Sequence, residues 1–136
     1  MGSAVARSER RSARTLVVDD EPGVLRLISL ALDAEGIEVD QASDGEEGLE
    51  RALTTDYEVV VLDLQLPKVD GITVLRRLLS ARPGQAIIVS TGRDDPSTRS
   101  ECFKAGARVF LAKPFSLADL VARVAAARGS CGVESP

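Results

Sequence analysis

The sequence predicts an α/β domain built on an open, doubly wound parallel sheet with helices on both faces. Five short runs rich in Val, Ile and Leu recur along the chain, and segments in which apolar residues step by three and four separate them. The runs are typical of strands, and the stepped segments are typical of helices with one buried face. Short connections between alternating strands and helices favour parallel pairing, because a return to a parallel strand requires a crossover.

The apolar runs give the expected strands. Three of them are apolar nearly throughout, as strands buried on both faces of a sheet are. The five runs are residues 15–19, 37–42, 58–63, 85–91 and 107–112.

Helical periodicity gives the expected helices and their buried faces. The segment 96–105 has the weakest apolar face, so we expect it to be the loosest helix. The buried positions expected in the other four helices are Val24, Leu27, Ile28 and Ala31, then Leu49, Ala52 and Leu53, then Ile72, Leu75 and Leu79, and finally Leu117, Leu120, Val121 and Val124.

Start and stop signals agree with these helices. Proline is favoured at the first helical position, short polar side chains at the N-cap and glycine just after the last turn. The signals are Pro22 and Pro96 as first residues, Asp44 with Glu47 as a capping box, Ser116 as an N-cap, and Gly36 and Gly106 as C-terminal glycines.

Composition indicates one acidic globular domain. The chain has 136 residues, 44% of them hydrophobic, and a net charge of -4, so it has no general attraction for nucleic acid. Residues 1–13 are expected to form a disordered basic arm or an expression remnant, residues 14–128 the folded domain, and residues 129–136 a linker-like tail. No apolar stretch is long enough for a signal peptide or a membrane span, which predicts a soluble cytoplasmic protein.

The chain contains no histidine, which restricts its chemistry. Ser-His and Cys-His nucleophile pairs are excluded. Cys102 and Cys131 lie far apart without CxxC spacing, which argues against a zinc site. Any chemistry must therefore use carboxylates, hydroxyls and lysine.

Polar residues collect at the carboxyl ends of the expected strands, where open α/β sheets bind ligands. Asp19, Asp20 and Asp63 would repel one another there without a positive partner, and a hard divalent cation such as Mg²⁺ would bind their oxygens. An anion on the metal would give Thr91 and Lys113 a role, since a hydroxyl and an ammonium can bind phosphoryl oxygens. Asp63 is then the candidate nucleophile, because a carboxylate can accept a phosphoryl group.

Four motifs in order resemble the receiver domain of two-component response regulators. They are "LVVDDEP", "VVVLDLQLPKVDG", "IIVSTGRDD" and "AGARVFLAKPF", and the resemblance runs from about Arg14 to Arg128. It implies a flavodoxin-like fold with a five-stranded parallel sheet of order 2-1-3-4-5 and five helices. It also implies a bacterial signalling protein that a histidine kinase or a small phosphodonor phosphorylates on aspartate.

The resemblance assigns roles around the phosphorylation site. Asp63 corresponds to the phosphoacceptor and Asp20 to a direct Mg²⁺ ligand. Asp19 corresponds to a ligand acting through a metal-bound water, and Gln65 to the residue that offers its backbone carbonyl. The side chains of Gln65 and Arg93 stand where the family tunes the lifetime of the phosphorylated state.

The resemblance also implies a switch. Thr91 corresponds to the switch hydroxyl, Lys113 to the phosphate-pairing lysine before a cis bond to Pro114, and Phe110 to the rotating aromatic. We expect Thr91 to move toward a phosphoryl group on Asp63 and Phe110 to turn into the space that Thr91 leaves. A protein-interaction face on the fourth and fifth helices and the fifth strand would then change.

The implied partners are a sensor histidine kinase or phosphotransfer protein, and an output domain or target protein. Phosphorylation-dependent homodimerisation is a further expectation, whereas direct contact with nucleic acid or membrane is not expected. The chain is then a switch with slow self-dephosphorylation and no turnover activity. Two alternatives stay open: an adaptor that signals by binding alone, and a Mg²⁺-dependent aspartyl phosphatase. The phosphatase is disfavoured because Gln65 occupies the position of its second acid.

Overall fold

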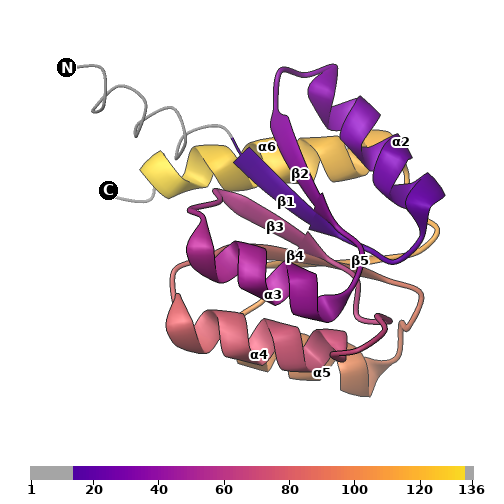
Figure 1. Cartoon of the computed structure of the whole chain (residues 1–136), viewed down its shortest axis with the longest axis vertical. Coiled ribbons are helices and arrows are strands. Elements are labelled where there is room, and N and C mark those ends of the chain that lie inside the picture. Colours follow the sequence, from indigo (N-terminus) through magenta and orange to yellow (C-terminus); the bar gives the residue numbers. More distant parts are fainter. Residues whose placement is uncertain (1–13, 134–136) are drawn as a thin grey trace.

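The computed structural model describes residues 14–133 (Figure 1). Five strands form one parallel sheet of order β2-β1-β3-β4-β5, which confirms the expected fold class. The elements are β1 (Arg14–Val18), α2 (Pro22–Asp33), β2 (Glu38–Ala42), α3 (Gly45–Thr54), β3 (Val59–Leu62), α4 (Gly71–Ala81), β4 (Ala86–Thr91), α5 (Pro96–Ala105), β5 (Val109–Ala112) and α6 (Leu117–Val133).

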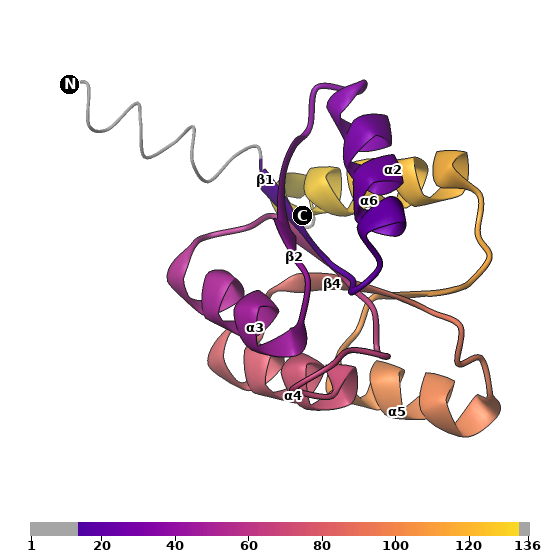
Figure 2. The same ribbon diagram turned by 45° about the vertical axis from the view of Figure 1, so that its right-hand side comes forward.

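The helices cover both faces of the sheet in two layers. Figures 1 and 2 show α2 and α6 on one face and α3, α4 and α5 on the other. Alternate residues of β1 divide between the two cores: Leu16 and Val18 pack with residues of α3, α4 and α5, whereas Val17 packs with residues of α2 and α6. The sheet is therefore buried on both faces, as its apolar strands predict.

The helix ends follow the expected signals. Asp44 Oδ1 accepts a hydrogen bond from the Glu47 N–H at 2.7 Å, and Ser116 Oγ accepts one from the Asp119 N–H at 2.9 Å. Gly106 ends α5 with a φ of 115°, a left-handed conformation that glycine adopts at little cost.

The buried faces of α2 and α3 differ from the expectation at two positions. Leu27 is 55% exposed and Leu53 is 39% exposed. In α2 the buried residues are Leu25, Ile28 and Leu32. The reason is that "VLRLISLAL" is apolar at most positions, so its periodicity fits more than one helical face and packing selects one.

Helix α5 has few buried side chains, as expected. Only Thr98 and Cys102 are buried, whereas the helix α4 beside it buries six residues. Phe103 is 46% exposed on its surface. Little apolar burial therefore holds α5 against the sheet.

The last helix extends beyond the boundary expected for the folded domain. Helix α6 continues to Val133, into the range expected for a linker-like tail at 129–136, because no proline interrupts its hydrogen bonding before Pro136. The basic arm expected at 1–13 and the last residues, 134–136, lie outside the described residues. Among the described residues, no helix has both the length and the apolar character needed to cross a bilayer.

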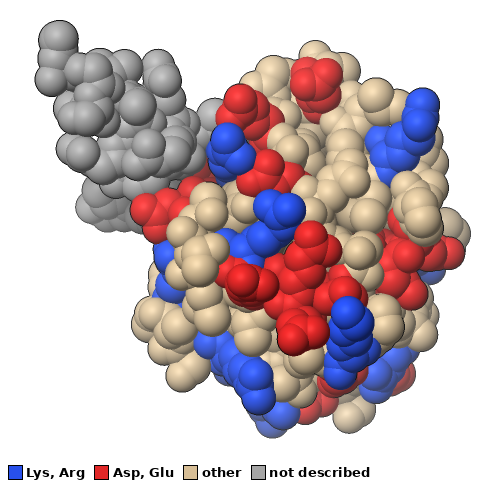
Figure 3. Space-filling model, viewed as in Figure 1, with Lys and Arg blue, Asp and Glu red and all other residues tan. Residues whose placement is uncertain are grey.

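Charges are mixed on the surface. Figure 3 shows acidic and basic side chains interspersed on one face, with an acidic group over α3. The first turn of that helix carries Glu46 and Glu47. No broad basic surface is seen on this face, in keeping with the net charge of -4.

Candidate functional site

The order of the strands brings the acidic residues together. Strands β1 and β3 are neighbours in register, with Val18 opposite Leu62, so the residues that follow them lie at the same edge. The Asp63 N–H donates to the Val18 carbonyl at 3.0 Å, and the Asp19 N–H donates to the Ala42 carbonyl of β2 at 3.1 Å. Sheet hydrogen bonding therefore fixes the backbone of both aspartates.

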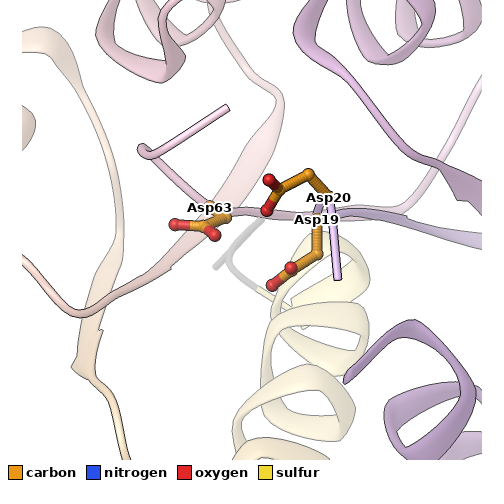
Figure 4. Close-up of side chains that lie close together, drawn as sticks. All are labelled: Asp19, Asp20 and Asp63. Atoms are coloured by element: carbon orange, nitrogen blue, oxygen red, sulfur yellow. The ribbon is translucent and has the colours of Figure 1, made fainter. Parts of the chain in front are cut away.

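Three carboxylates form a cluster at this edge. One oxygen from each of Asp19, Asp20 and Asp63 lies within 4.8 Å of the others (Figure 4). Asp19 is 1% exposed and Asp63 is 3% exposed, whereas Asp20 is exposed. Hard carboxylate oxygens at this spacing, with one side open to solvent, suit a divalent cation that keeps part of its water shell.

Lys113 is a basic partner of the cluster. Its Nζ donates to Asp19 Oδ2 at 2.8 Å and to Asp63 Oδ2 at 3.2 Å, and it lies 3.8 Å from Glu21 Oε1. We expected the carboxylates to need a cation for lack of a positive neighbour, but the lysine from the end of β5 meets part of that need. One ammonium opposite three carboxylates still leaves the cluster negative.

Backbone amides hold the remaining oxygens of the two buried aspartates. Asp19 Oδ1 accepts from the Glu21 N–H, and Asp63 Oδ1 accepts from the Gln65 N–H, both at 3.0 Å. Each carboxylate is thus oriented by the loop that follows it, while its second oxygen faces Lys113.

Burial and the charges in the cluster shift two pKa values. Burial raises the pKa of Asp63 above its ordinary value, although the Gln65 N–H and Lys113 oppose the shift. Burial alone would lower the pKa of Lys113, but the hydrogen bond to Asp19 and the charges of Asp63 and Asp19 raise it. Lys113 therefore stays cationic at neutral pH.

Thr91 ends β4 next to the cluster. It is fully buried, and its carbonyl accepts a hydrogen bond from the Lys113 N–H at 2.8 Å. Its Oγ1 accepts from the Arg93 N–H at 3.2 Å, and among the described residues no hydrogen bond joins it to Asp63. The hydroxyl is thus bound to the β4–α5 loop.

The two loops beside the cluster approach one another. A Cβ placed on Gly92 would lie 3.3 Å from Gln65 Oε1, so the amide of Gln65 lies close to the backbone of the β4–α5 loop. Gln65 and Arg93 are both exposed. The peptide bond between Lys113 and Pro114 is cis, as the resemblance implied.

Phe110 packs against side chains of α5. It is 8% exposed, and the guanidinium carbon of Arg99 lies 4.7 Å from the centre of its ring. The ring of Phe103 lies 6.5 Å from that of Phe110, centre to centre. Arg99 also pairs with Asp94 at 2.8 Å. Sequence analysis missed Arg99, because no pattern pairs a residue on an exposed helix face with a ring on a following strand.

Comparison with known proteins identifies the family. The family described as response regulator receiver domain matches residues 15–125. The chain therefore belongs to the receiver domains of two-component response regulators.

Several relatives share this family. The chain is 38% identical over 120 residues to the transcriptional regulatory protein TrcR of Mycobacterium tuberculosis, covering 88% of this chain and 47% of TrcR. It is 38% identical over 115 residues to the transcriptional regulatory protein SrrA of Staphylococcus aureus, covering 85% of this chain and 47% of SrrA. The chain spans about half the length of these curated relatives.

Solved structures share the fold. A CheY-like receiver domain from Methanospirillum hungatei JF-1 superposes with a TM-score of 0.87 at 28% identity, covering 90% of this chain and 98% of that one. The DrrB receiver domain activated with BeF3 superposes with a TM-score of 0.78 at 31% identity, covering 85% and 96%.

Proposed function

We propose that Asp63 is the phosphoacceptor of this receiver domain. The observation that carries the proposal is a nearly buried carboxylate held between a backbone N–H and the Lys113 ammonium. An oxygen of Asp63 attacks the phosphorus of the donor, and the bond from phosphorus to the donor's nitrogen or oxygen breaks, its electron pair leaving with the donor. The product is an aspartyl phosphate.

We propose that Asp19, Asp20 and Asp63 bind Mg²⁺, with Gln65 contributing its backbone carbonyl and Asp19 acting through water. The clustered oxygens and the residual negative charge support this ion. When bound, Mg²⁺ supplies positive charge that offsets the charge of the phosphoryl oxygens. Lys113 would bind the same oxygens through its ammonium, and Thr91 would donate its hydroxyl to them.

We infer that phosphorylation acts on the face formed by α5, β5 and α6. Thr91 is bound to the β4–α5 loop and Phe110 packs under α5, so a shift of the hydroxyl toward Asp63 would disturb both. Gln65 and Arg93 are exposed on the two loops beside the acidic cluster and would influence how fast water removes the phosphoryl group. The domain then works as a switch that returns slowly to rest and has no turnover activity.

We propose that the unit 14–128 receives its phosphoryl group in the cytoplasm from a sensor histidine kinase or a phosphotransfer protein, and passes its state to an output domain or target protein. Relatives that are transcriptional regulators and are about twice as long support an output domain. Phosphorylation-dependent homodimerisation through the same face is a further part of this proposal.

Intact mass after incubation with Mg²⁺ and acetyl phosphate or phosphoramidate tests the proposal. We expect the wild type and Asp70→Asn to gain one phosphoryl group when Mg²⁺ is present. Asp70 is a matched control, because it lies in the same β3–α4 loop but outside the acidic cluster. Asp63→Asn should gain none. If the wild type gains no mass with either donor, an adaptor that signals by binding alone becomes the better reading.

A further inference from the structure

Phe110 is held by two residues of α5. The Arg99 guanidinium lies over its ring at 4.7 Å, which is a cation–π contact, and the Phe103 ring lies 6.5 Å away at an angle of 47°. Phe103 is 46% exposed, whereas Phe110 is 8% exposed. If the ring turned inward toward Thr91, as proposed above for the switch, it would move away from both side chains.

Arg99 is in turn tied to the loop that contacts Thr91. Its Nη2 donates to Asp94 Oδ1 at 2.8 Å, and its Nε donates to the same oxygen at 3.3 Å. Asp94 directly follows Arg93, whose N–H donates to the Thr91 hydroxyl. A continuous set of contacts therefore leads from Thr91 through residues 93 and 94 to Arg99 and the Phe110 ring.

We propose that Arg99 is a latch, positioned by Asp94, that holds Phe110 against α5 while the domain is unphosphorylated. The proposal rests on the switch role proposed above for Thr91 and Phe110. A contact made in one state and absent from the other shifts the equilibrium by its whole free energy. When Thr91 leaves the Arg93 N–H, the loop that carries Asp94 is released and the hold of Arg99 on the ring weakens.

The first measurement is the affinity for beryllofluoride with Mg²⁺, a mimic of the phosphoryl group. Arg99→Gln should bind it about two- to fivefold more tightly than the wild type, because an exposed cation–π contact no longer opposes activation. Arg99→Lys should lie between the two, since lysine keeps the charge. Arg51→Gln is a matched control on α3, outside the face proposed to switch: Arg51 and Glu47 are 45% and 39% exposed, against 46% and 43% for Arg99 and Asp94.

The second measurement is fluorine NMR of protein labelled with fluorophenylalanine. The chain has only three phenylalanines, so Phe110→Leu assigns the signal of residue 110. In the unphosphorylated protein, Arg99→Gln should move this signal toward its position in the beryllofluoride complex, and Arg51→Gln should not. In a Phe110→Leu background, Arg99→Gln should leave the beryllofluoride affinity unchanged.

The latch is overturned if Arg99→Gln matches the wild type in beryllofluoride affinity and in the Phe110 signal, or if it binds beryllofluoride more weakly. It is also overturned if Arg99→Gln still changes the affinity in the Phe110→Leu background. Failure of the proposed function is a separate result, because the wild type itself would then not bind beryllofluoride. In that case the latch is refuted as a part of the switch, and the Phe110 signal of unbound Arg99→Gln tests only whether Arg99 contacts the ring.

Discussion

At the scale of single residues, Asp63 combines a cost in stability with the role of phosphoacceptor proposed for it. Burial raises the pKa of Asp63 above 3.8, so folding favours the neutral carboxyl group. The stability of the folded state that depends on this neutral form is fully present below pH 3.8 and is lost as pH rises through the folded pKa. At neutral pH the metal-free protein therefore bears the cost of a charged, nearly buried carboxylate.

Asp63→Asn should raise the free energy of unfolding of the metal-free protein by about 1 kcal/mol at pH 7, because it removes this charge while Lys113 keeps Asp19 as its partner. The gain should shrink as pH falls into the acid range. With saturating Mg²⁺ the wild type should become more stable than Asp63→Asn, since the ion stabilises the folded protein that binds it. Urea unfolding across pH, with and without Mg²⁺, measures both effects. A less stable metal-free variant at pH 7 would contradict the cost assigned to this charge.

Tyr57 is the only tyrosine of the chain, and its hydroxyl is tied to the edge strand. It donates to Asp40 Oδ2 at 2.7 Å, and Arg14 Nη1 donates to both oxygens of that carboxylate. Burial and the neighbouring Asp40 charge raise the pKa of Tyr57 to about 12. The neutral phenol is thus favoured in the folded state.

The ultraviolet titration of tyrosinate should therefore have its midpoint near 12 in the folded protein and near 10 in denaturant. Since the folded pKa is raised, the stabilisation is complete below pH 10 and is lost as pH rises to about 12, amounting to roughly 2 to 3 kcal/mol. Tyr57→Phe should lack this alkaline loss. A folded midpoint near 10 would mean that the Tyr57–Asp40 contact does not exist in solution.

At the scale of elements, the start of α4 is packed tightly against the loop after β3. A Cβ on Gly71 would lie 2.3 Å from the Leu64 Cα and 2.6 Å from the Asp63 carbonyl oxygen. These are backbone atoms, which cannot move without shifting the loop that orients Asp63. Gly71 is therefore needed for the close approach of α4 to the backbone of Asp63 and Leu64.

Gly71→Ala should destabilise the protein by at least about 2 kcal/mol and slow phosphorylation, because overpacking displaces the acceptor loop. Gly23→Ala is the control: a Cβ there meets nothing within 4 Å, and alanine in α2 should stabilise by about 0.5 to 1 kcal/mol. Thermal unfolding measures the stability of both variants, and the rate of mass gain with acetyl phosphate measures their phosphorylation. Equal stability of the two variants would show that the loop yields to the new methyl group.

Strands and helix ends could be predicted because their signals are local. Pro22, Asp44 and Ser116 act on the first turn of their own helices, and the five strands are contiguous apolar runs. The buried face of α2 could not be predicted, since most of its positions are apolar and packing against the sheet decides between Leu25 and Leu27.

At the scale of the whole molecule, the cluster of acids could be predicted, but the partners within it could not. Parallel strands bring Asp19 and Asp63 to one edge by topology alone. The bridge from Lys113 to both aspartates depends on side-chain conformations. The contact of Arg99 with Phe110 depends on how α5 lies on β5, which no local pattern encodes.

The uneven burial of the helices predicts an uneven stability across the fold. Helix α5 buries only Thr98 and Cys102, whereas α4 buries six residues, and stability within a domain follows such local burial. Amide hydrogen exchange should therefore be faster in α5 than in α4 or β4.

Beryllofluoride with Mg²⁺ should change exchange most in α5 and the loop before it, because this weakly held helix faces Phe110 and carries Arg99. Helix α2 should change less, since it packs on the opposite face of the sheet through Ile28 and Leu32. Exchange in Phe110→Leu separates the direct effect of ligand binding from the effect passed on through Phe110. In this variant, protection changes near Asp63 should persist, and those in α5 should diminish. If α5 is as protected as α4 at rest and unchanged on binding, the phosphorylation signal does not leave the site through this helix.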